Sequence, residues 1–251
     1  MQAKDLMKIV LGPKGLSQES PLLKPQCYHQ VTSDGLCSMV MLESGIKKSL
    51  LETLVETEQG MSILFKFVEF NPNVIQDCSF TPRRSSLQQD EVSSPFWRLA
   101  LSRLGRNILL RVIRSKPGIV SENLLNCPFY INGLKFGSAA ALFACSIQGI
   151  EILKTLARQA VFVLPDVLIS QVTFGGYTNA VVGHLINCPE GVDFLSCMIK
   201  MKKTVLSPKS IEVVFRSNPP VARIVAELQN LESRGRAGIM LPQITPLKRY
   251  G

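Results

Sequence analysis

The strongest constraint on the fold is a glycine that recurs along the chain at intervals of 45, 44 and 42 residues. Four segments begin on this glycine and share aliphatic or aromatic residues three and four places later: Gly60-Met61-Ser62-Ile63-Leu64, Gly105-Arg106-Asn107-Ile108-Leu109, Gly149-Ile150-Glu151-Ile152-Leu153 and Gly191-Val192-Asp193-Phe194-Leu195. Self-similarity at a nearly fixed period is typical of repeat proteins, in which each unit packs on its neighbours. We therefore expect a stack of similar units.

The residues after each glycine predict a helix. Apolar residues stand at the third, fourth, seventh and eighth places, the last two being Phe67-Val68, Val112-Ile113, Leu156-Ala157 and Met198-Ile199. This spacing forms one face of an amphipathic helix. Two places after the glycine stand residues that can accept hydrogen bonds from free amides: Ser62, Asn107, Glu151 and Asp193. We expect them at the start of that helix.

A second apolar column precedes the glycine by six and five places and predicts an earlier helix. Its members are Leu54-Val55, Leu99-Ala100, Phe143-Ala144 and Leu185-Ile186. Ser49, Ser94 and Ser138 stand eleven places before the first three glycines, where they are expected to be the N-caps of the earlier helix. Each unit is thus predicted to be a capped helix, a short turn that contains the glycine, and a second helix.

A proline ends each unit, at Pro72, Pro117, Pro165 and Pro208. Because proline stops a helix and can begin a new turn, the second helix should end before it. Apolar pairs follow the first three prolines: Val74-Ile75, Ile119-Val120 and Val167-Leu168. This tail of the unit is expected to be either a third short helix or an irregular finger.

The units resemble ankyrin repeats, whose pattern runs G-x-T-P-L-H-x-A-A, a short turn, and an I-V/L-x-x-L-L helix. The best match is Phe136 to Cys145 followed by Gly149 to Leu153, and Ser94 to Leu101 is similar. The T-P-L-H tetrapeptide is never intact, and the period is 42 to 45 residues in place of 33. The resemblance implies an all-α solenoid of about four ankyrin-like units with long inter-repeat fingers. HEAT or armadillo repeats, with periods of roughly 40 to 47 residues, are the structural alternative.

Four regions are expected along the chain. Residues 1–44 would form an irregular N-terminal arm and cap, and residues 45–205 the helical repeats. Residues 206–232 would form C-terminal capping helices, since a terminal repeat needs a polar outer face. Residues 233–251 would form a flexible basic tail. A polar loop is expected within the first connection, from Thr81 to Val92.

The chain contains no pattern that predicts catalysis, a cofactor or a metal site. It lacks a P-loop, a dinucleotide-binding glycine motif and an HExxH sequence. The two histidines are His29 and His184, and His184 is expected to be a packed or concave-face residue, since no ligand cluster accompanies it. We therefore expect no enzyme, no cofactor and no metal.

Other sequence features bear on the compartment. No window reaches the roughly 18 consecutive apolar residues that span a bilayer, and the first residues lack the apolar core of a secretory signal. The seven cysteines are scattered and odd in number, which favours reduced thiols in a cytosol-like compartment. Divergent ankyrin-like proteins with irregular spacing resemble bacterial effectors, so delivery into a host cell is a further hypothesis.

The net charge of +9 is concentrated in three groups, one in the second unit and two further ones: Lys200, Lys202, Lys203 and Lys209, and Arg234, Arg236, Lys248 and Arg249. Between Ser94 and Gly118 the sequence holds six cations and no acid: Arg98, Arg103, Arg106, Arg111, Arg114 and Lys116. Such a run indicates either a surface for an acidic protein, nucleic acid or phosphoinositide, or a solvated outer face whose side-chain stems cover apolar surface.

These features favour a non-enzymatic scaffold that binds a protein partner through the concave or finger face of the stack. The expected contacts are exposed arginine and aromatic residues, which commonly anchor interfaces, together with the histidine of the fourth unit: Trp97, Arg98, Arg103, Arg106 and His184. The alternative is a helical-repeat binder of nucleic acid or another polyanion. It is less favoured, because aromatic residues are not interleaved with the basic series as base stacking would require.

Overall fold

The computed structural model describes residues 2–12, 20–42, 44–84, 92–131, 134–174 and 176–201. This part of the chain is mostly helical, and its strands pair only as two-stranded antiparallel hairpins. The predicted all-α class is therefore confirmed at the level of secondary-structure content. The predicted capping helices at 206–232, the tail at 233–251 and most of the polar loop within Thr81–Val92 lie outside the described residues.

Each repeated unit consists of a β-hairpin, a first helix and a second helix, and in the first three units a short helical exit segment follows. The hairpins are β1 (Met39–Met41) with β2 (Lys47–Ser49), β3 (Arg83–Arg84) with β4 (Val92–Ser93), β5 (Pro128–Ile131) with β6 (Leu134–Ser138), and β7 (Gln171–Phe174) with β8 (Tyr177–Ala180). The first helices are α4 (Leu50–Leu54), α6 (Pro95–Leu101), α9 (Ala139–Ala144) and α12 (Val181–Ile186). The second helices are α5 (Glu58–Phe70), α7 (Arg103–Ser115), α10 (Ile147–Arg158) and α13 (Pro189–Lys200).

The exit segments are short helices that contain or adjoin the apolar pairs found after the prolines. They are η2 (Pro72–Val74) with η3 (Asp77–Phe80), α8 (Glu122–Asn126) and α11 (Pro165–Ile169). All three pairs are buried: Val74-Ile75, Ile119-Val120 and Val167-Leu168. Of the two expected forms of this tail, the structure contains the short helix, which leads into a paired β-hairpin of the next unit in place of an irregular finger.

The N-terminal region differs from the irregular arm predicted for residues 1–44. It contains α1 (Ala3–Leu11), η1 (Pro21–Leu23), α2 (Pro25–Tyr28) and α3 (Ser33–Cys37). Leu6, Met7 and Val10 of α1 are buried, and α1 packs against α3 and α4. These three side chains lie on one helical face, which covers the open side of the first unit. The prediction of an irregular segment is therefore wrong for these helices.

The three predicted serine caps of the first helices are confirmed. Ser49 accepts a hydrogen bond from the Glu52 amide at 3.1 Å, and the Glu52 carboxylate accepts one from the Ser49 amide in return. The Ser94 and Ser138 hydroxyls likewise accept from backbone amides in the first turns of α6 and α9. Such caps satisfy amides that have no partner within the helix, and each contributes about 1 kcal/mol.

The second helices begin two residues before the recurring glycine, earlier than predicted. Their caps are Thr57, Ser102 and Ser146, whose hydroxyls accept from the glycine amides at 3.0, 2.8 and 3.1 Å. The expectation that the residues two places after the glycine stand at the helix start is therefore wrong. Ser62, for example, is already within α5, where its hydroxyl donates to the Glu58 carbonyl.

The recurring glycine belongs to the first turn of the second helix and not to the preceding turn. A Cβ atom added at Gly105 would lie 2.1 Å from the carbonyl oxygen of Leu99, six residues earlier in α6. The corresponding distances are 2.3 Å at Gly60, 2.2 Å at Gly149 and 2.0 Å at Gly191. Only a residue without a side chain permits this approach of the two backbones. The recurring glycine is therefore explained by close packing of the second helix on the first, and its predicted role in a turn is wrong.

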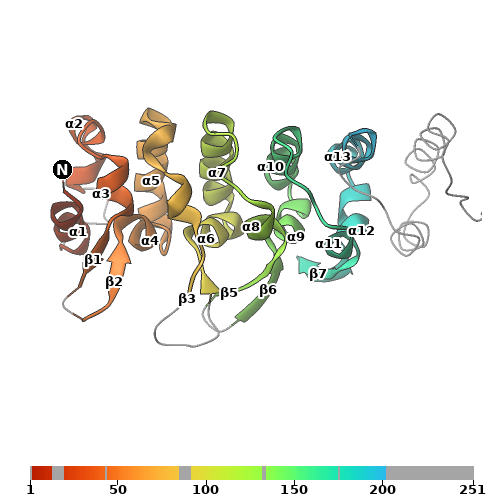
Figure 1. Ribbon diagram of the computed structural model, residues 1–251, viewed down its shortest axis with the longest axis horizontal. Coiled ribbons are helices and arrows are strands. Elements are labelled where there is room, and N and C mark those ends of the chain that lie inside the picture. The colour runs from red at the N-terminus through yellow and green to blue at the C-terminus, as the bar shows by residue number, and fades with distance from the viewer. Residues whose placement is uncertain are drawn as a thin grey trace, which may run out of the picture.

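The helix pairs stack side by side in chain order (Figure 1). The second helices contact one another in sequence, from α5 through α7 and α10 to α13, and α9 contacts both α6 and α12. In the view of Figure 1 the second helices lie along the top of the stack and the hairpins along the bottom. The two predicted apolar columns are buried between the pairs wherever their side chains are described. The stack therefore has two different long surfaces, one of helices and one of hairpins.

Candidate functional site

Trp97 lies in the core, although the sequence predicted an exposed contact. Its side chain is 3% exposed and stacks on Phe129 of β5, with 5.1 Å between ring centroids and an interplanar angle of 9°. The indole Nε1–H donates to the carbonyl of Leu124 at 3.0 Å. Because α6 is a first helix, it is covered by its neighbours on both sides. The predicted contact role of Trp97 is therefore wrong.

Arg106 closes the end of the helix that precedes it. Its Nη1 donates to the carbonyls of Ala100 and Leu101, at 2.9 and 3.2 Å, where α6 ends. Burial lowers the pKa of this guanidinium from its usual value. The bonds satisfy carbonyls that have no partner within α6 and hold the side chain against the backbone. The Arg106 guanidinium is thus engaged in hydrogen bonds that stabilise the fold. Of the other two arginines predicted as contacts, Arg103 is exposed and Arg98 is half-buried.

Cys145 is the thiol that faces Arg106. Burial raises the pKa of Cys145 to about 11, and the charge of Arg106 offsets part of this effect. The thiol donates to the carbonyl of Ala141 at 3.3 Å. Among the described cysteines, Cys27, Cys37, Cys127, Cys145, Cys188 and Cys197 are free. Cys145 is therefore held in its neutral form, which is a poor nucleophile.

His184 joins a helix to a hairpin. It is half-buried on α12, and its Nε2 lies 3.2 Å from the carbonyl oxygen of Val172 in β7. Cys188 follows four residues later, and its thiol donates to the carbonyl of Leu185 at 3.7 Å. The two side chains therefore bond to different carbonyls. Among the described residues, His, Cys, Asp and Glu side chains form no group of three or more that could ligate a metal ion.

The acids that the basic run lacks are supplied by the neighbouring second helices. Arg111 of α7 lies 3.6 Å from a carboxylate oxygen of Glu69 in α5. Arg114 of α7 donates to Glu151 of α10 at 2.9 Å. The cations are thus divided between the two sides of α7. This pairing could not be inferred from residues 94–118 alone, because it depends on which helices are adjacent.

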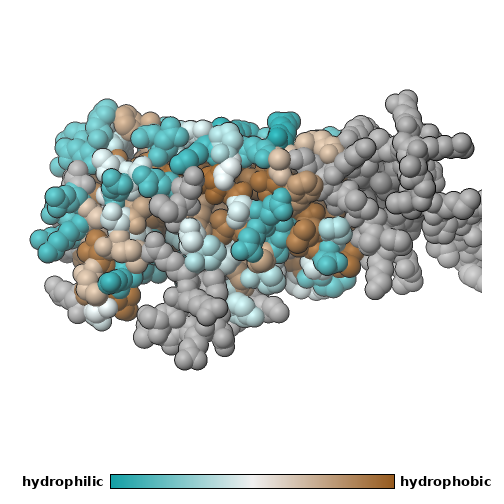
Figure 2. Space-filling view, viewed as in Figure 1, coloured by the Kyte–Doolittle hydropathy of each residue, from teal (hydrophilic) through white to brown (hydrophobic). Residues whose placement is uncertain are grey.

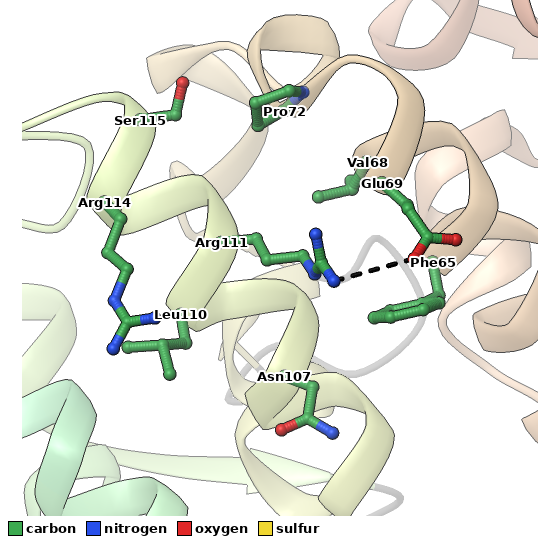
Figure 3. A pocket seen from close by; sticks show the side chains of 9 residues that line it. All are labelled: Phe65, Val68, Glu69, Pro72, Asn107, Leu110, Arg111, Arg114 and Ser115. Carbon is green, nitrogen blue, oxygen red and sulfur yellow. Dashed lines mark ion pairs between the residues drawn. The ribbon is translucent and has the colours of Figure 1, made fainter.

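A groove of about 640 Å³ lies between α5 and α7. Figure 3 shows Arg111 extending from α7 across this groove toward Glu69 and Phe65. The Arg111 guanidinium carbon lies 5.1 Å from the centre of the Phe65 ring, which is a cation–π contact. The remaining lining residues are a mixture of apolar and polar side chains: Val68, Pro72, Asn107, Leu110, Arg114 and Ser115. The groove thus combines an apolar floor with two arginines.

The hairpin surface exposes large apolar side chains. Met39 and Met41 of β1 and Ile46 of the connecting turn are exposed, and so is Tyr177 at the start of β8, with an exposed fraction of 78%. Figure 2 shows hydrophobic residues over the β1–β2 hairpin, at the lower left of the stack. The turns of both hairpins contain a glycine with positive φ, Gly45 at 78° and Gly176 at 83°. Sequence reasoning missed this surface, although these glycines are a signal for hairpins.

None of the helices in the described part of the chain has the length and apolar character that crossing a bilayer requires. Within the described residues, the α5–α7 groove and the hairpin surface are the two candidate contact regions. Neither could be assigned by comparison with known proteins. No protein-family model matches the chain, and no curated protein or solved structure is significantly similar to it.

Proposed function

We propose that the chain is an ankyrin-type scaffold that binds a protein partner through its hairpin surface. The order of elements supports the ankyrin type over the HEAT and armadillo alternatives. An ankyrin unit is a β-turn followed by two helices, whereas HEAT and armadillo units consist of helices alone. Here a hairpin precedes every helix pair. The short exit helices and the hairpins account for a period longer than that of ordinary ankyrin units.

The observation that carries the proposed function is the exposure of large apolar side chains on the hairpins. Met39, Met41 and Ile46 gather on the hairpin of the first unit, and Tyr177 stands at the hairpin of the fourth. Contiguous exposed apolar groups commonly mark protein contact sites, and methionine and tyrosine are enriched there. A polar partner such as nucleic acid would not require them. A protein partner that spans the row of hairpins would bury the exposed apolar side chains of both the first and the fourth hairpin.

The polyanion alternative has less support. Of the second unit's arginines, Arg111 and Arg114 face carboxylates, and Arg106 binds backbone carbonyls. Trp97, the one aromatic residue proposed to accompany them at a contact site, is buried. An extended basic track with stacking platforms, as single-stranded nucleic acids require, is not what these contacts provide.

Affinity capture from lysate with a hairpin variant tests the proposal. The Met41→Asp/Tyr177→Asp variant places charges on exposed hairpin positions, so the fold should be retained. Partner recovery, measured by quantitative mass spectrometry, should fall at least tenfold relative to the unmodified chain. The matched control is Ile147→Asp, which alters an exposed apolar residue at the start of α10, where an acid suits the helix dipole. Equal recovery by the hairpin variant and the control would contradict the proposal.

A further inference from the structure

We propose that the groove between α5 and α7 is a second binding site, one that takes an acidic, amphipathic segment of a protein partner. Carboxylates of that segment would meet Arg111 and Arg114, and an apolar side chain would lie on Phe65. This inference goes beyond the proposed function. The groove lies among the second helices, on the side of the stack away from the hairpins (Figure 1).

The shape and lining of the groove suit a side chain that is partly apolar. Its volume of about 640 Å³ is within the range of about 300–1,000 Å³ that is typical of ligand-binding pockets. Phe65 of α5 is half-buried and lies beside the guanidinium of Arg111, and Leu110 of α7 is a half-buried residue of the same lining (Figure 3). An apolar residue placed on the Phe65 ring would remove the exposed part of that side chain from water. The floor therefore supplies the hydrophobic part of the contact.

The charges at the groove leave a positive surplus. The Glu69 carboxylate is shared between Lys66, at 3.1 Å, and Arg111, at 3.6 Å, so that one carboxylate faces two cations. Because these side chains are close to half-exposed, their ion pairs contribute no more than about 1 kcal/mol each. A carboxylate from a partner can take the place of Glu69 at Arg111 at little cost. The groove thus favours an acidic occupant.

The next junction along the stack is built differently. At the position of Ser115 in α7, α10 carries Gln159, whose side-chain amide crosses to the carbonyl of Ile113 at 2.9 Å. Arg114 also reaches over this junction to Glu151. Ser115, by contrast, is a short side chain at the edge of the α5–α7 groove, where its hydroxyl donates to Asn73 at 3.0 Å. Because α7 carries the short Ser115 where α10 carries Gln159, this end of the α5–α7 groove stays open.

The arrangement favours a peptide over nucleic acid. Arg111 and Arg114 are three residues apart on α7, and their guanidinium groups lean to opposite sides of that helix, toward Glu69 of α5 and Glu151 of α10. The carboxylates of Glu69 and Glu151 flank this pair of arginines, one on each side, and they would repel a continuous phosphate backbone. Separate acidic side chains on a folded or extended peptide avoid that repulsion. The site is therefore suited to a local pair of acids beside an apolar residue.

A random twelve-residue peptide library displayed on phage provides the probe, with the full chain as bait and the Arg111→Ala/Arg114→Ala variant for counter-selection. Recovered peptides should combine aspartate or glutamate with an aromatic or aliphatic residue. Synthetic copies should bind the double variant at least tenfold more weakly than the unmodified chain, as measured by fluorescence anisotropy. Phe65→Ala should also weaken binding. The matched control is Arg158→Ala, which removes an exposed arginine at the same repeat position on α10 as Arg114 on α7 and should leave affinity within twofold.

Three results would overturn the inference. They are recovery of peptides that lack acids, binding that does not depend on the two arginines, and equal arginine-dependent binding of a single-stranded oligonucleotide, which would make the site a general polyanion site. Circular dichroism of each variant establishes that the fold is retained, as expected for exposed positions. Because Met41→Asp/Tyr177→Asp leaves the groove intact, it should not change peptide affinity. A failure of this inference is thus distinguishable from a failure of the hairpin proposal.

Discussion

Replacing Gly105 with alanine tests whether the recurring glycine reflects close packing. The added Cβ would lie 2.1 Å from the Leu99 carbonyl oxygen and 2.6 Å from the Leu99 Cα. Ordinary contacts between carbon atoms are about 3.5–4.0 Å, so α7 would have to move away from α6 by roughly 1 Å. Both atoms at the clash belong to the backbone, which cannot rotate away as a side chain can.

The magnitude follows from two opposing effects. Overpacking of this kind costs about 1–3 kcal/mol and sometimes more, whereas alanine in a helix gains about 0.5–1 kcal/mol over glycine. The movement also strains the hydrogen bond from the Gly105 amide to the Ser102 hydroxyl, a cap that contributes about 1 kcal/mol. We therefore expect Gly105→Ala to lower the free energy of unfolding by about 2 kcal/mol or more.

Urea unfolding followed by far-ultraviolet circular dichroism measures this loss as a lower midpoint at an unchanged slope. The control is Gly137→Ala, whose Cβ would lie 3.4 Å from that of Ala141, in ordinary contact, and which should change stability by less than about 1 kcal/mol. If Gly105→Ala were as stable as the unmodified chain, or more stable, the close-packing explanation of the glycine column would be refuted.

Three further predictions concern individual side chains. Trp97→Phe should lower the free energy of unfolding by about 1–3 kcal/mol in urea titrations, because it removes the indole donor from a buried carbonyl. Arg106→Met should cost about 1.5–3 kcal/mol in the same assay, whereas Arg103→Met, at an exposed site, should stay within about 0.5 kcal/mol. Iodoacetamide should alkylate Cys145 far more slowly than the exposed Cys127 at pH 8, and the Cys145 rate should keep rising up to about pH 11, since burial raises its thiol pKa. Peptide mapping by mass spectrometry checks this, and equal rates at pH 8 would contradict it.

The parts of the fold that follow from local patterns could be predicted from the sequence. The apolar columns around the glycines and the caps Ser49, Ser94 and Ser138 depend on spacing within one helix, and the structure confirms them. The start of the second helix was misplaced, because a glycine in the first turn has the same sequence appearance as a glycine in a turn. What distinguishes them is the distance to the preceding helix, which is a tertiary property.

The candidate sites could be predicted only in part, because they depend on which units are adjacent. Trp97 was expected at the surface from its residue type and its arginine neighbours, but a first helix is covered on both sides. The groove requires Phe65 of one unit and Arg111 of the next to face each other, although the two lie 46 residues apart in the sequence. Only the adjacency of α5 and α7 brings them together.

Amide hydrogen exchange on the complex with a captured partner is the most direct test of the proposed scaffold function. If the hairpin surface binds the partner, amide exchange in the hairpins at residues 39–49 and 171–180 should be slower in the complex, because backbone amides in the contact would be shielded from water. Exchange in α10, which lies away from the hairpins in Figure 1, should not change. Protection confined to the second helices, with the hairpins exchanging as in the free chain, would contradict the claim that the hairpin surface binds the partner.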